Sequence, residues 1–266
     1  MNILFALLTV ALLGGAFGFG LSYAEKKLAI KKDEKLLELE PIMPGVNCGV
    51  CGYAGCNAYA SAIAKDGAEL DLCAPGGPDL VALIGKIMGM VVEVDPNERR
   101  KVARVMCQGN IDFTARDYAY DGPMDCNAAS LLMGGDNTCK DGCLRMGSCI
   151  KVCPTDAISK NAEGYIVIDE AKCISCEKCV AICPTGVMHM IYEDSEYSID
   201  CNSKLPGGRV RKFCSVGCIG CKICENKYPE SGCKVENFLA YFDQAVPHNQ
   251  IADAAEACPT KIIIKR

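Results

Sequence analysis

Residues 173–184 read Cys-Ile-Ser-Cys-Glu-Lys-Cys-Val-Ala-Ile-Cys-Pro, and this run indicates the fold of the chain. Two residues separate each neighbouring pair of the first three cysteines, and a fourth cysteine follows directly before a proline. This spacing is the ligand signature of proteins that hold two [4Fe–4S] clusters side by side. The three close thiolates bind one cluster, and the cysteine before proline binds the other. We therefore predict a pair of iron–sulfur clusters.

The other half of the motif lies upstream, where Cys143, Cys149 and Cys153 precede a proline in the same way. Met146 stands where the middle cysteine belongs, and Cys139 lies close enough in sequence to supply the missing thiolate. We predict that Cys139, Cys143, Cys149 and Cys183 hold cluster 2, and that Cys153, Cys173, Cys176 and Cys179 hold cluster 3. Zinc knuckles are the alternative for cysteines at such spacings.

A shift of 75 positions superimposes this motif on the C-terminal region and reveals an internal repeat. Met146 then falls on Cys221, and Cys183 falls on Cys258. The four ligands of cluster 3 are replaced together in the second copy, by Tyr228, His248, Ile251 and Ala254. Loss of one whole cluster explains the joint replacement of these four ligands better than independent substitutions do. His248 could in principle bind iron, but the other three positions carry no ligand. The second copy is predicted to hold a single cluster 4, on Cys218, Cys221, Cys224 and Cys258.

A separate cysteine group lies nearer the N-terminus, and it consists of Cys48, Cys51, Cys56 and Cys73. Zinc sites of four cysteines usually come as two close pairs, whereas this group is a tight trio with a distant fourth member. Glycines interleave the trio, so the backbone can wrap closely around a compact object. We predict a [4Fe–4S] cluster 1 here, with zinc or free buried thiols as alternatives. A helix over residues 54–64 and another from Asp79 to about Val94 should pack beside it.

Five cysteines remain without a place in these four clusters, namely Cys107, Cys126, Cys201, Cys214 and Cys233. Cys126 and Cys201 are related by the repeat, and both lie within Asp-Cys-Asn. One hypothesis is a fifth cluster, held by Cys107, Cys126, Cys201 and Cys214. The alternative is that these thiols are buried small side chains or relics of the duplication.

The composition agrees with metal-bound thiols and excludes several classes of protein. Cysteine accounts for 21 of 266 residues, an odd number, and half of the residues are hydrophobic. A disulfide-stapled secreted domain is therefore excluded. Two histidines are too few for most imidazole-based metal enzymes, and a net charge of −5 gives no reason to expect nucleic acid as a partner.

The first 24 residues carry no charge, and residues 3–21 are apolar or small except for one threonine. This length predicts one transmembrane helix at residues 1–24. Lysines follow the span and none precedes it, so the bulk of the chain should face the cytoplasm of a prokaryotic cell. A cleaved signal peptide is the alternative, but the basic start is missing.

Four segments together resemble one known family. They are Cys48-Gly-Val-Cys-Gly-Tyr-Ala-Gly-Cys56, Val105-Met-Cys-Gln-Gly109, Asp125-Cys-Asn-Ala-Ala129 and Cys214-Ser-Val-Gly-Cys-Ile-Gly-Cys221. With the apolar start and the ferredoxin motifs, the chain resembles the B subunits of the Rnf electron-transport complex. The resemblance implies a membrane complex that moves electrons between ferredoxin and NAD while it pumps Na⁺ or H⁺. It implies soluble ferredoxin as the electron donor and other subunits of the complex as partners.

No GxGxxG or GxxxxGK[ST] motif and no catalytic triad is visible, so NAD, flavin and ATP chemistry is expected on partner chains. The chain itself should be an electron relay with four [4Fe–4S] clusters, or five. A relay to a redox-sensing regulator, a stand-alone tethered ferredoxin and a zinc scaffold are the alternatives. Two basic segments, around Arg100 and Arg211, could dock an acidic ferredoxin or balance the charge of the clusters.

These observations predict an α+β chain of consecutive parts. The transmembrane helix should occupy residues 1–24, a membrane-proximal helix 25–40, a helical 4Fe–4S domain 41–95 and a connecting segment 96–135. A ferredoxin-like domain with two clusters should follow at 136–195, with a short strand at 165–168 and helices that begin at the Cys-Pro steps. A degenerate ferredoxin-like domain with one cluster should end the chain at 196–266.

Overall fold

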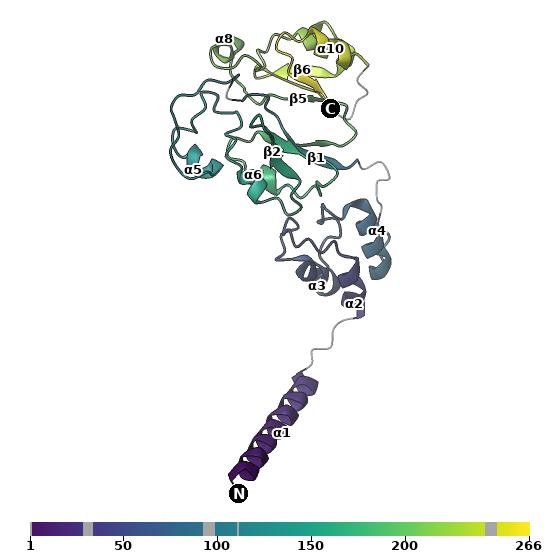
Figure 1. The fold of residues 1–266 in the computed structure, drawn as a ribbon. Coiled ribbons are helices and arrows are strands. Elements are labelled where there is room, and N and C mark those ends of the chain that lie inside the picture. Colours follow the sequence, from purple (N-terminus) through teal and green to yellow (C-terminus); the bar gives the residue numbers. More distant parts are fainter. Residues whose placement is uncertain (1, 29–33, 93–98, 111, 243–248) are drawn as a thin grey trace.

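The computed structural model describes residues 2–28, 34–92, 99–110, 112–242 and 249–266. Figure 1 shows an extended arrangement, with helix α1 (Asn2–Leu28) at one end and the C-terminal elements at the other. We call residues 34–92 the helical unit, residues 99–195 the central unit and residues 196–266 the C-terminal unit, in each case for their described residues. The mixture of helices and short strands agrees with the predicted α+β class.

The predicted transmembrane helix needs correction. Of the helices that the structure describes, none is long and apolar enough to span a membrane. The prediction for residues 1–24 is therefore wrong. Helix α1 also continues past residue 24 into charged residues such as Glu25.

The helical unit contains α2 (Glu34–Leu39), a short 3-10 helix η1 (Glu40–Ile42), α3 (Cys56–Asp66) and α4 (Gly77–Met88). Its core contains Leu39, Tyr59, Ile63 and Ile84. The helix predicted over 54–64 is thus confirmed as α3. The helix predicted over 25–40 appears in the described residues as the end of α1 and the short α2, with residues 29–33 outside the described part.

Helix α4 is shorter than predicted. It ends at Met88 because Gly89 adopts φ 72° and its N–H bonds the carbonyls of Gly85 and Lys86, a C-cap that glycine favours. Its N-cap is Gly76 rather than Asp79, which lies in the first turn, where a carboxylate meets the positive end of the helix dipole. Residues 93–94 of the predicted helix lie outside the described residues.

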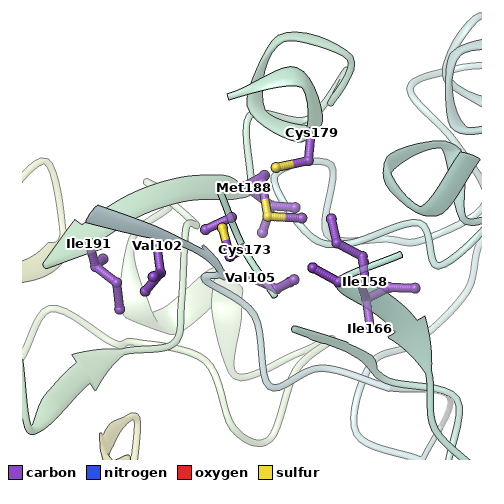
Figure 2. Close-up of a cluster of buried hydrophobic side chains, with 11 residues drawn as sticks. Val102, Val105, Ile158, Ile166, Cys173, Cys179, Met188 and Ile191 are labelled. Atoms are coloured by element: carbon purple, nitrogen blue, oxygen red, sulfur yellow. The ribbon is translucent and has the colours of Figure 1, made fainter. Parts of the chain in front are cut away.

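The central unit is built on two antiparallel strand pairs. Strand β1 (Lys101–Val105) pairs with β4 (Met188–Tyr192), and β2 (Ile158–Lys160) pairs with β3 (Ile166–Ile168), which confirms the predicted strand. Figure 2 shows apolar side chains of these strands packed together with two of the predicted cluster ligands, Cys173 and Cys179. The ligands are therefore positioned by the hydrophobic core itself.

The helices of the central unit are one to two turns long. They are α5 (Cys126–Ser130), α6 (Ser148–Lys151) and α7 (Lys178–Ala181). Two of them, α6 and α7, precede the Cys-Pro steps. The prediction that helices begin at the Cys-Pro steps is therefore wrong. A residue before proline is disfavoured in the helical conformation, so α6 and α7 end before Cys153 and Cys183.

The C-terminal unit repeats this plan. Strand β5 (Tyr197–Ile199) pairs with β8 (Ile263–Lys265), and β6 (Cys233–Glu236) pairs with β7 (Leu239–Phe242). Its other elements are α8 (Gly207–Val210), α9 (Ile223–Asn226), the 3-10 helix η2 (Pro229–Ser231) and α10 (Ile251–Ala257).

The central and C-terminal units are joined by a shared network. Arg104 on β1 forms a 2.9 Å ion pair with the buried Asp200, whose carboxylate also accepts a 2.6 Å bond from Ser198. The backbone N–H of Ala115 donates to the carbonyl of Phe213 at 2.7 Å, so the connecting segment crosses into the C-terminal unit. This crossing brings cysteines of both units together.

Candidate iron–sulfur centres

The cysteine loops of both sheet units share one backbone conformation. In each loop a residue with negative φ lies between two residues in the left-handed region, and a short helix follows. Met146 lies between Arg145 (φ 58°) and Gly147 (φ 81°). Cys176 lies between Ser175 (φ 59°) and Glu177 (φ 56°). Cys221 lies between Gly220 (φ 62°) and Lys222 (φ 60°). Such φ values are uncommon outside glycine. Met146 therefore occupies the structural position of a ligand cysteine.

The cysteines predicted for cluster 3 surround one cavity. About 340 Å³ of space is lined by Cys153, Cys173, Cys176 and Cys179. The backbone N–H of Ala157 donates to the Cys153 sulfur at 3.3 Å. Burial and neighbouring thiolates raise the pKa of Cys179 to about 12. A bound metal must therefore supply the positive charge that deprotonates this thiol.

The cysteines predicted for cluster 4 surround a second cavity, of about 350 Å³, lined by Cys218, Cys221, Cys224 and Cys258. Its wall is apolar and includes Val235, Ile262 and Ile263. Cys233 lies just outside it, and a hydrogen bond between the two thiols raises the pKa of Cys224. Sequence spacing carried no signal of this contact, because Cys233 comes from strand β6. His248 lies outside the described residues.

The cysteines predicted for cluster 1 also lie together. Burial raises the pKa of Cys73, and the thiols of Cys56, Cys48 and Cys51 are close enough to raise it further. Asn47 fixes the loop, since its side-chain carbonyl accepts a 2.8 Å bond from the N–H of Cys56.

The cysteines predicted for cluster 2 are divided between two places. Cys149 interacts electrostatically with Cys183 and with Cys126, which was not among its predicted neighbours. Cys143 interacts most strongly with Cys107 and then with Cys149 and Cys126, so it lies between the two places. Cys139 instead interacts with Cys107 and Cys214.

A third cavity lies where the central and C-terminal units meet, and we call it the interunit cavity. It holds about 410 Å³ and is lined by residues that include Cys107, Cys139, Cys143, Cys201 and Cys214. Of the hypothetical fifth set, it therefore receives Cys107, Cys201 and Cys214, whereas Cys126 is absent from its lining.

The donor sets fit iron–sulfur clusters by number and type, because each cavity presents at least four thiols. All 21 cysteines are free thiols. Over the described ranges, no three His, Cys, Asp or Glu side chains form a group that could hold a metal ion. The cysteines are instead spread around cavities.

The two basic segments differ in their surroundings. Arg99 donates to Asp194 at 2.8 Å, and Arg100 forms an ion pair with Glu193, so the first segment is neutralised within the protein. In the second segment Arg209, Arg211 and Lys212 lie on and after α8, where Arg209 and Arg211 are exposed. The second segment is the more accessible docking candidate.

Two family models match the chain. The FeS model, described as an Fe–S cluster, matches residues 43–75, and the 4Fe-4S dicluster domain model matches residues 138–187. These ranges contain all the predicted ligands of clusters 1, 2 and 3.

Several relatives match over most of their length. The B subunit of the Na(+)-translocating ferredoxin:NAD(+) oxidoreductase complex of Acetobacterium woodii is 34% identical, covering 94% of this chain and 74% of the relative. The B subunit of the proton-translocating ferredoxin:NAD(+) oxidoreductase complex of Clostridium ljungdahlii is 38% identical, covering 98% and 92%. The B subunit of the ion-translocating oxidoreductase complex of Methanosarcina acetivorans is 36% identical, covering 87% of each chain.

Proposed function

Because the chain belongs to the family of B subunits of ion-translocating ferredoxin:NAD(+) oxidoreductase complexes, we propose that it is their iron–sulfur relay. It accepts electrons from ferredoxin and passes them to other subunits of the complex. The observation that carries this proposal is the succession of cysteine-lined cavities along the chain. A [4Fe–4S] cluster supplies one-electron redox chemistry when it is bound.

The protein residues provide the insulation and the spacing that such a relay needs. Cys48 of the helical unit lies close enough to Cys176 to influence its pKa, which joins the sites of clusters 1 and 3. Cys149 has the same relation to Cys179, which joins the sites of clusters 2 and 3. The proposed path therefore connects the helical unit with the central unit.

The final step, the reduction of NAD⁺, requires a partner chain. Two ferredoxins each release one electron, and NAD⁺ takes up both together with one proton. The chain has no recognisable nucleotide-binding motif, so we place this step on another subunit.

We place the complex at a membrane, because ion translocation stores free energy only when the ion moves between two separate compartments. The iron–sulfur units belong on the cytoplasmic side. Free thiols survive in that reducing compartment and remain available as ligands.

Electron acceptance can be tested on the full chain, prepared without oxygen. We expect a brown protein whose broad visible absorbance bleaches when reduced ferredoxin is added. Iron and labile sulfide should be present in equal amounts, with little zinc. A colourless protein with stoichiometric zinc would contradict the relay and support a structural metal module.

The function within the complex needs a second experiment. Vesicles that contain the purified complex should reduce NAD⁺ with reduced ferredoxin, and a sodium or a proton ionophore should change the rate. An intact, active complex whose rate responds to neither ionophore would argue against coupling to ion movement.

A further inference from the structure

We infer that the interunit cavity is the site of a fifth [4Fe–4S] cluster, held by Cys107, Cys139, Cys201 and Cys214. The same arrangement assigns Cys126, rather than Cys139, to cluster 2 together with Cys143, Cys149 and Cys183, because Cys126 packs beside Met146 and its N–H bonds Ser148, the neighbour of Cys149. This inference rests on the proposed role of the chain as an iron–sulfur relay.

The interunit cavity resembles the other cluster sites in its thiols, although its lining is more polar and includes Asp141, Arg145 and Asp200. About 410 Å³ of space, part of it open to solvent, lies between its lining residues, compared with about 340 and 350 Å³ at the sites of clusters 3 and 4. Those two sites satisfy the sequence signature of clusters independently. A cavity of similar volume with as many thiols therefore fits a cluster of the same kind.

Glycines stand against the sulfurs of this cavity, where a larger residue would fill the space. A Cβ atom on Gly142 would lie 3.4 Å from the Cys139 sulfur, and one on Gly217 would lie 3.3 Å from the Cys214 sulfur. A Cβ on Gly109 would lie 3.4 Å from the Cys107 sulfur. Three of the four proposed ligands thus have glycine beside them, although none of these glycines has a positive φ that requires it.

Hydrogen-bond donors and a buried cation surround the same sulfurs. The N–H of Cys218 donates to the Cys201 sulfur at 3.3 Å, and the Thr114 hydroxyl lies 3.8 Å from the Cys214 sulfur. Arg145 is buried in the lining and donates to the carbonyl of Gly109 at 2.6 Å. A cluster with four thiolates carries about two negative charges, which a buried guanidinium and N–H donors stabilise.

Hydrogen bonds and packing hold Cys126 at the site of cluster 2. Its N–H donates to the Ser148 hydroxyl at 2.7 Å, and that hydroxyl donates to Asp125 at 2.8 Å. Cys126 also packs against the cluster of buried residues that contains Met146. The thiol missing from the local motif is thus supplied by α5, from the preceding segment of the chain.

The fifth cluster completes the relay between the two sheet units. Cys107 interacts electrostatically with Cys143 on the central side, and Cys201 contacts Cys218 on the C-terminal side. The sites then follow in the order cluster 1, cluster 3, cluster 2, fifth cluster, cluster 4.

Iron analysis of the full chain, reconstituted without oxygen, tests the number of clusters. Five clusters give about 20 iron atoms per chain, and four give about 16. About 16 would overturn the fifth cluster and leave the relay intact, whereas zinc without iron would overturn both. The count needs no variant, so it holds even where substitutions prevent folding.

Matched variants test the ligand assignment. Cys107→Ala/Cys214→Ala should lose about four iron atoms, because two ligands of one cluster disappear. Adding Cys139→Ala should remove no further iron, whereas adding Cys126→Ala should damage a second cluster and remove more. The opposite result for these two additions would return Cys126 to the fifth cluster and Cys139 to cluster 2. Val167→Ala, at a side chain that is 39% exposed and lines none of these cavities, is the control and should keep the wild-type iron content.

Electron paramagnetic resonance tests the same ligand assignment independently of the iron content. The reduced double variant should lack one cluster signal of the wild type, and the variant with Cys139→Ala should give the same spectrum as the double variant. A spectrum unchanged from wild type in the double variant would overturn the assignment.

Discussion

At the scale of single residues, the loop around Met146 shows how a local motif can lose a ligand while its backbone persists. Arg145 and Gly147 keep the left-handed conformation that flanks Cys176 and Cys221 in the sister loops. A methionine thioether is a poor ligand for an iron–sulfur cluster, which is held by thiolates. A cysteine at position 146 should therefore be able to replace Cys126 as a ligand of cluster 2.

This similarity predicts a rescue. Cys126→Ala should lose iron from cluster 2, and the double variant Cys126→Ala/Met146→Cys should recover it, because the new thiol stands at the position of Cys176 in the sister loop. Iron content and the paramagnetic spectrum measure the effect. The matched control Cys126→Ala/Met146→Leu should not recover iron. Equal iron in both double variants would show that position 146 does not face the cluster.

At the scale of elements, the short strands position ligands through the core they form. Ile191 on β4 is 1% exposed and packs in the same cluster of buried residues as Cys173 and Cys179. Loss of packing around Ile191 should therefore displace the cysteine ligands of cluster 3.

Truncation of this core side chain should therefore destabilise the central unit. We expect Ile191→Ala to lower the free energy of unfolding by about 2–5 kcal/mol through lost burial and a cavity. Val167→Ala on β3, where the side chain is 39% exposed, should cost under about 1 kcal/mol. Denaturant titration of the full chain, followed by cluster absorbance, measures both. Similar midpoints would contradict this account of the core.

Helix α8 predicts a docking surface, since Arg209 and Arg211 are exposed beside the lining residue Val210 of the interunit cavity. At low salt, Arg209→Glu/Arg211→Glu should slow reduction by ferredoxin on the order of tenfold. The control Lys65→Glu/Lys86→Glu makes the same change of charge on α3 and α4 and should have a small effect. Stopped-flow absorbance measures the rates. A larger loss in the control, or a rate independent of salt, would move docking away from α8.

At the scale of the whole molecule, every sheet in the described residues has two strands. A two-stranded sheet is marginal on its own, and the cysteines of these units line cavities rather than filling them. Cluster binding is therefore coupled to folding.

Removal of iron should unfold the sheet units. After chelation without oxygen, we expect the β-structure signal of circular dichroism to fall and proteolysis to cut within the central and C-terminal units. Restoring iron and sulfide should reverse both changes. An apoprotein that resists the protease as the loaded chain does would show that the hydrophobic cores suffice.

Features that depend on local spacing could be predicted from the amino-acid sequence alone. The ferredoxin motifs predicted a short strand at residues 165–168, which appears as β3. The repeat predicted that Met146 and Cys221 are equivalent, and their matching loops agree with it. Such features are readable because a few consecutive dihedral angles set which side chains converge.

Which distant cysteines lie together depends on the packing of the folded chain. Cys139 is near Cys143 in sequence, yet it faces Cys107 and Cys214, because the connecting segment pairs with the C-terminal unit. Spacing carries no information about such crossings, since they depend on contacts between units.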